Sequence, residues 1–419
     1  MNGLLVFVVA LLAWVLLSAR LQRWSITGAI VLTAAGLVAA WLPADTGSQL
    51  HSEWVRVLIE ATLAVVLFVD ASSIAVRWFR REWRYPLRLL GIGFPLTFVL
   101  GALVALVLFA GLNPWVAAVI GAALAPTDAA LGLAILENER IPLRFRQVIN
   151  VESGLNDGLA TPVVAFCIAL ATADLDRTVA HPVSSAVVEI VIGVVVGALV
   201  GAVLGFLTRV AAASHVAEPL LVPLVPLVTA LATYLGVVQL GGNGFVAAFV
   251  AGVAYGTANN AGRSEAREHR HAPVAPETLL LFTQRTAQLM ALGVWFVFGA
   301  AVLSRIDLAS IPRVLVYAVL SLTVLRMVPV AIAALGAHLP WDTVLLAGWL
   351  GPRGLASIIF ALLAAEEIGG SDGDFVLEVV AVTVALSVLA HGLSAGPLAT
   401  WYAARHPADA ADDEAAAPA

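Results

Sequence analysis

Long runs of apolar residues, separated by short polar connections, repeat along the whole chain. About thirteen such runs can be distinguished, and a helix needs roughly 20 mainly apolar residues to cross a bilayer. Their bounds are 3–20, 26–43, 57–76, 89–112, 114–136, 147–172, 183–209, 219–239, 243–259, 279–303, 313–336, 341–365 and 375–400. We number them spans 1 to 13. The pattern predicts an all-α polytopic membrane protein, with one transmembrane domain over residues 1–402.

The composition supports a membrane protein. The chain is 61% hydrophobic and 12% charged, whereas a soluble domain carries about 25% charged residues. The 22 residues counted as Lys or Arg are all Arg, which excludes Schiff-base chemistry and a P-loop lysine. The single Cys167 excludes an internal disulfide. We expect no cofactor, no nucleic-acid partner and no soluble partner, with membrane lipids around the spans.

Charge alternates between the two ends of the predicted spans. The odd-numbered spans are followed by Arg20, Arg23, Arg77, Arg80, Arg81, Arg84, Arg88, Arg140, Arg144, Arg146, Arg263, Arg267 and Arg270. The connections after even-numbered spans are poor in Arg and often acidic. Because cytoplasmic loops carry the excess of basic residues, we expect the N-terminus outside and the C-terminus inside a bacterial-type plasma membrane. The Ala-, Asp- and Pro-rich end, 403–419, is predicted to be a short disordered cytoplasmic tail.

Two spans are interrupted at corresponding places. Span 5 contains Ala-Pro-Thr-Asp at 125–128, and span 12 contains Gly-Pro-Arg-Gly at 351–354. Pro and Gly break a helix and leave backbone polar groups without helical partners. The two spans are the fifth of the first six and the fifth of the last six. A matched pair of broken helices is typical of a transporter site built from inverted repeats, so we predict two inverted six-helix repeats.

Span 6 carries an acidic cluster. Glu152 and Asn156 are four residues apart, as are Ser153 and Asp157. On a helix these pairs form two adjacent stripes. Ionisable residues at membrane depth are costly, and they mark ion pathways and proton relays.

The broken span 5 adds Thr127 and Asp128 to the predicted site. The resulting set of carboxylate, hydroxyl and carbonyl oxygens suits a monovalent cation. Burial and a neighbouring carboxylate both favour the protonated form of an acid. We therefore expect a cation and a proton to compete for Asp157.

Arg326 lies in the middle of span 11, and Arg353 lies in the break of span 12. An Arg side chain stays protonated, so each needs an anion or exposed carbonyl groups. We predict that Arg326 pairs with Glu152, and that Arg353 meets carbonyl groups at the break.

Plainer interpretations exist for several of these acids. Asp128 can cap a helix at a break, and Glu152 can be purely structural as the partner of Arg326. Asp70, near the inner end of span 3, can reach the membrane surface along its own side chain. Glu60, near the outer end of that span, has the same two possible interpretations, structural or functional.

The sequence resembles the cation/proton antiporter-1 family, and most closely its bacterial sodium/proton antiporter branch. The residues that carry the resemblance are Thr127-Asp128, Glu152-Ser153-x-x-Asn156-Asp157, Arg326, Gly351-x-Arg353-Gly354 and Leu67-Phe68-Val69-Asp70-Ala71. The resemblance extends over residues 5–400.

It implies a homodimer with a scaffold of spans 1–3 and 7–10 and a moving core of spans 4–6 and 11–13. It also implies that Asp157 binds the cation and the proton, that Asp128, Thr127, Ser153 and Glu152 line the site, and that exchange is electroneutral because Asn156 precedes Asp157.

A potassium/proton antiporter, or a different cation-coupled transporter on the same fold, uses the same kind of oxygen ligands. An intramembrane enzyme is disfavoured, because His-Glu-x-x-His is absent and Val151 stands where a Gly-x-Ser-Gly motif needs Gly.

Overall fold

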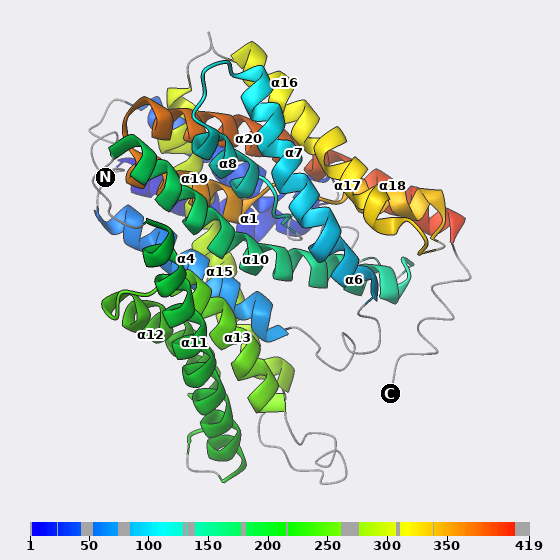
Figure 1. Ribbon diagram of the computed structural model, residues 1–419. Coiled ribbons are helices and arrows are strands. Elements are labelled where there is room, and N and C mark those ends of the chain that lie inside the picture. Colours follow the sequence, from blue (N-terminus) through cyan, green and yellow to red (C-terminus); the bar gives the residue numbers. More distant parts are fainter. Residues whose placement is uncertain are drawn as a thin grey trace.

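In the part of the chain that the computed structural model describes, all regular secondary structure is helical (Figure 1). It describes residues 2–22, 24–42, 53–73, 84–128, 131, 138, 140–176, 182–214, 217–260, 276–306, 311–337 and 339–406. The predicted all-α class is confirmed over these residues. The Arg-rich stretches 74–83 and 261–275, Arg23 and the tail from residue 407 lie outside them.

The helices follow the hydrophobic runs. They are α1 (Asn2–Gln22), α2 (Gly28–Ala40), α4 (Glu53–Ser73), α6 (Arg84–Arg88), α7 (Phe94–Leu108), α8 (Pro114–Ala123), α10 (Leu143–Asp176), α11 (Pro182–Ala213), α12 (Val225–Gln239), α13 (Gly244–Asn260), α15 (Pro276–Val297), α16 (Ile311–Leu322), α17 (Val324–Ala334), α18 (Trp341–Trp349), α19 (Leu355–Ile368) and α20 (Gly370–Arg405), with π-helical turns at Leu89–Gly93 and Phe298–Val302 and 3-10 turns at Val222–Leu224 and Leu303–Arg305.

Every predicted span contains a helix of the described chain. Among the described residues, 8 helical segments are long and apolar enough to cross a bilayer by length and composition. The multi-pass class is therefore supported, while the count of thirteen stays a prediction. One boundary differs from expectation. Helix α20 continues to Arg405, so residues 403–405 are helical and not part of a disordered tail.

Helices α4, α11, α12 and α13 pack together, and we call them the α13 group (Figure 1). Their close approach depends on glycines spaced by four residues. A Cβ atom on Gly197 or Gly201 of α11 would lie 2.5 or 2.2 Å from the carbonyl oxygen of Ala247 or Ala251 on α13. A Cβ atom on Gly252 of α13 would lie 2.4 Å from the backbone of α4. Small residues at such spacing let membrane helices pack backbone to backbone.

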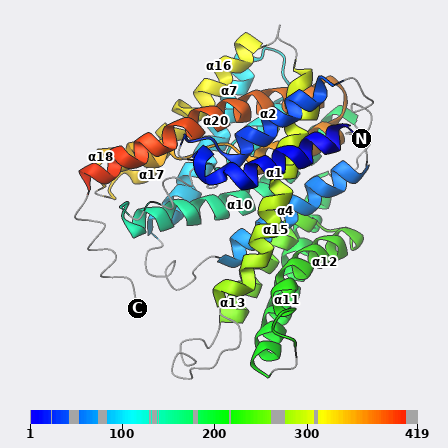
Figure 2. The ribbon, with the colours of Figure 1, turned by 180° about the vertical axis from the view of Figure 1, so that it is seen from behind.

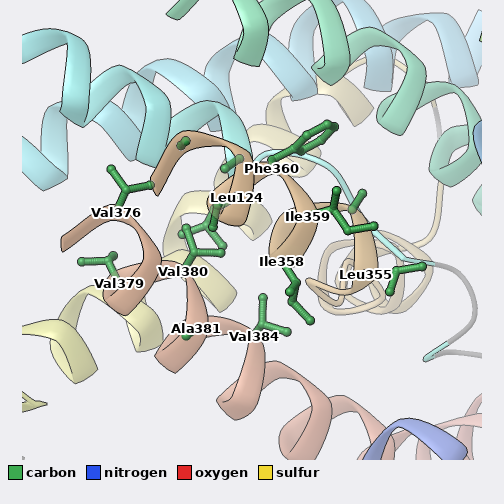
Figure 3. Close-up of a cluster of buried hydrophobic side chains, with 14 of the residues drawn as sticks. Leu124, Leu355, Ile358, Ile359, Phe360, Val376, Val379, Val380, Ala381 and Val384 are labelled. Carbon is green, nitrogen blue, oxygen red and sulfur yellow. The ribbon is translucent and has the colours of Figure 1, made fainter. Parts of the chain in front are cut away.

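Helices α8, α10, α19 and α20 pack together at the other side of the molecule, and we call them the α19 group. Their shared core surrounds α19, where apolar side chains of α19 and α20 interdigitate (Figure 3). It includes Leu124, Leu355, Ile358, Ile359, Phe360, Val376, Val379, Val380 and Val384. Because lipid tails are as apolar as these side chains, close packing holds this core together.

Helix α10, a member of the α19 group, also contacts α4, α11 and α13 of the α13 group (Figure 1). On the face turned to the viewer in Figure 2, α1 packs on α2, which in turn packs on α15. The α2 and α15 backbones come close, since a Cβ atom on Gly36 would lie 2.1 Å from the carbonyl oxygen of Phe296.

Both predicted interruptions are present in the described residues. Helix α8 ends at Ala123, and residues 124–128 are not helical. Helix α18 ends at Trp349, and α19 begins at Leu355. A further break, which the sequence analysis did not predict, separates α16 from α17 at Thr323, with φ −113° and ψ −90°. It lies three residues before Arg326.

Candidate functional site

The two predicted helix breaks meet in space. The backbone N–H of Asp128, in the break after α8, donates to the carbonyl oxygen of Pro352, in the break between α18 and α19, at 2.8 Å. The backbone N–H of Leu355 donates to Asp128 Oδ2 at 3.1 Å. Asp128 therefore caps a helix, as one interpretation of the sequence held. The helix that it caps is α19, more than 200 residues further along the chain.

Gly354 makes room for this cap. It is the residue before the first turn of α19, where a Ser, Thr, Asn or Asp side chain commonly accepts from the orphan backbone N–H groups. A Cβ atom on Gly354 would lie 1.9 Å from Asp128 Oδ2. Glycine at this position thus leaves room for the Asp128 carboxylate, which accepts the N–H that a local side chain would usually accept.

Arg353, in the break between α18 and α19, bonds in turn to the break after α8. Its guanidinium Nη1 donates to the carbonyl oxygens of Ala125 at 2.9 Å and Pro126 at 3.0 Å. Its backbone N–H donates to Ser387 Oγ on α20 at 2.7 Å. The expected carbonyl partners are therefore present, but they belong to the other broken helix. Arg353 is fully buried, and its charge balances the carbonyl groups that the break exposes.

Glu152 and Arg326 form a buried ion pair. Arg326 Nη2 lies 2.6 Å from Glu152 Oε1, and the two side chains are 2% and 1% exposed. The contact expected from the sequence is present. It joins α10 to α17 just after the break at Thr323. A Cβ atom on Gly351 would lie 2.3 Å from Arg326 Nε, so the Arg326 side chain lies directly against the α18–α19 break.

The polar side chains of α10 face Thr127. The hydroxyl of Ser153 donates to the Thr127 carbonyl oxygen. The Asn156 amide nitrogen lies 3.4 Å from Thr127 Oγ1 and 3.3 Å from Glu152 Oε1. Ser153, Asn156 and Thr127 are all buried. The structure therefore brings the predicted oxygen-bearing groups of α10 and the α8 break together.

Asp157 differs from the other two acids of the cluster. It is 8% exposed, one helical turn beyond Ser153 on α10. Over the described residues its carboxylate has no hydrogen-bond or ion-pair partner, although Thr161 donates to its main-chain oxygen at 2.8 Å. Glu152 has Arg326 and Asp128 has the α19 N-terminus. Among these three acids, Asp157 is the one whose carboxylate has capacity left for an external proton or cation.

Asp70, whose role the sequence left open, lies beside this cluster. Its Cβ is 3.5 Å from where a Cβ atom on Gly154 of α10 would stand. Asp70 and Asp128 both lie close enough to Asp157 to act on it electrostatically. The partly buried Asp70 therefore lies beside the site. The signal in the sequence was a carboxylate within the apolar run of span 3.

The fold and the site define a class: a multi-pass helical membrane protein in which two interrupted helices cross beside a cluster of buried charges. The sequence matches the family described as sodium/hydrogen exchanger, transmembrane, over residues 6–401. The chain belongs to this family.

Individual relatives agree with that assignment. An uncharacterized Na⁺/H⁺ exchanger of Mycobacterium tuberculosis is 32% identical over 173 residues, which are 40% of this chain and 30% of the relative. The Na⁺/H⁺ antiporter ApNhaP of Aphanothece halophytica is 25% identical over 350 residues, 81% of this chain and 63% of the relative. The matched part of the chain thus spans less than two thirds of either relative's length.

The fold is similar to that of the sodium proton antiporter MjNhaP1 from Methanocaldococcus jannaschii. Against its structure at pH 8 the TM-score is 0.71, with 18% identity, 96% of this chain covered and 100% of the other. Against its electron-microscopy structure the TM-score is 0.72, with 19% identity and coverage of 94% and 96%. At this level of identity the likeness shows the fold.

Proposed function

We propose that the protein is a secondary active transporter that exchanges a monovalent cation for H⁺, with Na⁺ as the preferred cation. Cation and proton compete for Asp157 at a site exposed alternately to the two sides of the membrane. The observation that carries the proposal is the different state of the three acids. Glu152 is neutralised by Arg326 at 2.6 Å, and Asp128 caps α19. The Asp157 carboxylate has no hydrogen-bond or ion-pair partner over the described residues.

A buried carboxylate without a partner is costly unless it is neutralised. Either a proton or a cation neutralises Asp157, and a bound cation opposes protonation of the same group. The nearby carboxylates of Asp70 and Asp128 add to the attraction for positive charge. Loading one ion therefore expels the other, which is the requirement for exchange at one site.

Oxygen atoms around Asp157 supply further ligands for the cation. We assign the Thr127 carbonyl and hydroxyl, the Ser153 hydroxyl and the Asp128 carboxylate to this role, with Asn156 beside them. The Asn156 side-chain oxygen is buried and has no hydrogen-bond partner among the described residues. This oxygen can therefore accept a cation without giving up a hydrogen bond, while the amide nitrogen keeps its contacts with Thr127 and Glu152. The same oxygen ligands suit K⁺, so a potassium/proton antiporter is the alternative.

We assign the scaffold role to a domain of spans 1–3 and 7–10, and the moving role to a core of spans 4–6 and 11–13. The α13 group belongs to the scaffold, and its glycine-mediated backbone contacts support a rigid unit. The α19 group belongs to the core. The excess of Arg after odd-numbered spans supports an outside N-terminus and a cytoplasmic C-terminus. We further propose a homodimer and electroneutral exchange of one proton for one cation.

The test is exchange in proteoliposomes made with the full chain. A pH gradient is imposed, Na⁺, K⁺ or Li⁺ is added, and a pH-sensitive dye reports the gradient. We expect Na⁺ to dissipate the gradient in the wild type and not in Asp157→Asn. A membrane potential set with valinomycin should leave the initial rate unchanged. If no monovalent cation dissipates the gradient in the wild type, the proposal fails.

A further inference from the structure

Two glycines on α10 directly follow Ser153 and Asp157 in the sequence. Each of them lies against a residue of the α13 group. Gly154 and Gly158 are four residues apart and share one face of the helix. Gly154 faces Asp70 of α4. At Gly158 a Cβ atom would lie 2.2, 2.3 and 2.4 Å from the Cε2, Cδ2 and Cζ atoms of Phe249 on α13. The aromatic ring thus occupies the space that a side chain at position 158 would fill, one residue after Asp157.

The ring is held by a helix whose position is fixed. Helix α13 packs backbone to backbone on two of its neighbours in the α13 group, through Gly252 toward α4 and through Gly201 toward α11. Helix α10, in contrast, joins the α19 group through α8 and α19. The contact between Phe249 and Gly158 therefore crosses the boundary between the proposed scaffold and the proposed core. A relative movement of the two domains has to take the ring out of this notch.

The ring lies on one defined side of the ion site. Four residues of helix rise about 6 Å, so Phe249 contacts α10 about one turn nearer to Asp176 than Asp70 does. In the proposed orientation that end of α10 is the outer end.

Further toward the outside the apolar surface continues. Phe245 lies one turn from Phe249 on α13, and its ring centroid is 5.0 Å from that of Tyr234. The Tyr234 hydroxyl donates to Glu60 Oε2 at 2.9 Å. Along α13, Phe249 thus stands one turn nearer to the inner end than Phe245, the ring that contacts Tyr234.

We propose that Phe249 is the occluding residue of the outer pathway. Its ring, seated against Gly158, separates Asp157 from the outside, and it leaves the notch when the core moves to open the site outward. This inference rests on the proposed antiport and orientation. It adds a positioning residue from α13 to a site whose other members come from α4, α10 and the break after α8. Glycine at 158 is then required because the ring needs that space.

The experiment uses proteoliposomes containing wild type, Phe249→Ala, Gly158→Ala or the double variant. Two rates are measured: dissipation of an imposed pH gradient without any transported cation, and dissipation after Na⁺ is added. Phe206→Ala is the matched control, because it removes the same ring from an exposed position of α11. Thermal unfolding of each variant reports whether the protein is folded.

We expect the cation-independent leak to rise about tenfold in Phe249→Ala, equivalent to a barrier lowered by about 1.4 kcal/mol. Gly158→Ala should leak as well, because its methyl group displaces the ring. In the double variant the methyl group takes up part of the vacated space, so the leak should fall below that of either single variant. Phe206→Ala should hold the gradient like the wild type.

The proposal is overturned if Phe249→Ala folds and holds the gradient as tightly as the wild type. A role in packing alone would lower the unfolding temperature without a leak. Phe249→Leu, which keeps an apolar side chain, provides a second reading if Gly158→Ala does not fold, and it should leak less than Phe249→Ala. Failure of antiport itself is distinguished by the wild type, which would then show no response to any cation.

Discussion

Arg326 Nη2 and Glu152 Oε1 are 2.6 Å apart, and both side chains are almost fully buried. Taking two charges out of a polar solvent is costly, and their attraction offsets that cost only while both are present. The pair ties α10, which carries the ion site, to α17. We infer that its main role is structural, and that it keeps the Glu152 charge away from the exchange at Asp157.

Breaking this pair should destabilise the protein strongly. Glu152→Gln leaves Arg326 charged and unpaired, and we expect the free energy of unfolding to fall by about 3–5 kcal/mol. Chemical unfolding of the detergent-purified protein measures this. The control Glu152→Gln/Arg326→Met should recover most of the loss. A single variant as stable as the wild type would show that the pair does not support the fold.

An exposed ion pair in the same protein provides the contrast. Arg56 Nε lies 2.7 Å from Glu60 Oε1, and the guanidinium also contacts Glu366 at the end of α19, but the Arg56 side chain is 54% exposed. Exposed pairs contribute about 0–1 kcal/mol. Arg56→Gln should therefore change the unfolding free energy by less than about 1 kcal/mol. A loss as large as that of Glu152→Gln would contradict the view that burial decides the cost.

The contact between the two helix breaks depends on Gly354. In Gly354→Ala the new methyl group would collide with the Asp128 carboxylate, 1.9 Å away, and overpacking of this kind costs about 1–3 kcal/mol. We expect lower stability and slower exchange. Gly236→Ala is the matched control, because a Cβ atom there meets nothing within 4 Å and Ala is the better helix former by about 1 kcal/mol. If Gly354→Ala were as stable and exchanged ions as fast as Gly236→Ala, the contact between the two helix breaks would be contradicted.

Asp128 should have two separable roles. Asp128→Ala removes the acceptor for the Leu355 N–H, and loss of a cap costs about 1 kcal/mol. Asp128→Asn keeps an acceptor oxygen, so its unfolding free energy should stay nearer to that of the wild type. Both variants remove a carboxylate from the site, so both should raise the Na⁺ concentration needed for half-maximal exchange. If Asp128→Asn leaves that concentration unchanged, Asp128 is a cap and not a cation ligand.

Some of this arrangement could be predicted from residue types alone. Because a buried Arg needs an anion, the pairing of Arg326 with Glu152 could be predicted. Pro126 and Pro352 interrupt their spans because neither can continue a helical hydrogen-bond ladder. Spacing of four residues on one helix placed Ser153 beside Asp157.

Other features depend on which helices lie side by side, and the pattern of one chain does not contain that information. The capping of α19 by Asp128 and the bonds of Arg353 to Ala125 and Pro126 arise only where the two breaks cross. Asp70 could not be assigned for the same reason, since its neighbour Gly154 offers no polar signal. The break at Thr323 has neither Pro nor Gly at its centre and gave no sign in the sequence.

The most direct test of the central claim is proton release on Na⁺ binding. Na⁺ is titrated into purified protein in weakly buffered solution at a series of pH values, and the protons released and the apparent affinity are recorded for wild type and Asp157→Asn. Competition for Asp157 predicts that about one proton is released per Na⁺ bound in the acidic range. In that range the apparent affinity for Na⁺ should fall about tenfold for each unit by which the pH is lowered. Asp157→Asn should show neither. Na⁺ binding without proton release, with an affinity independent of pH, would contradict the account.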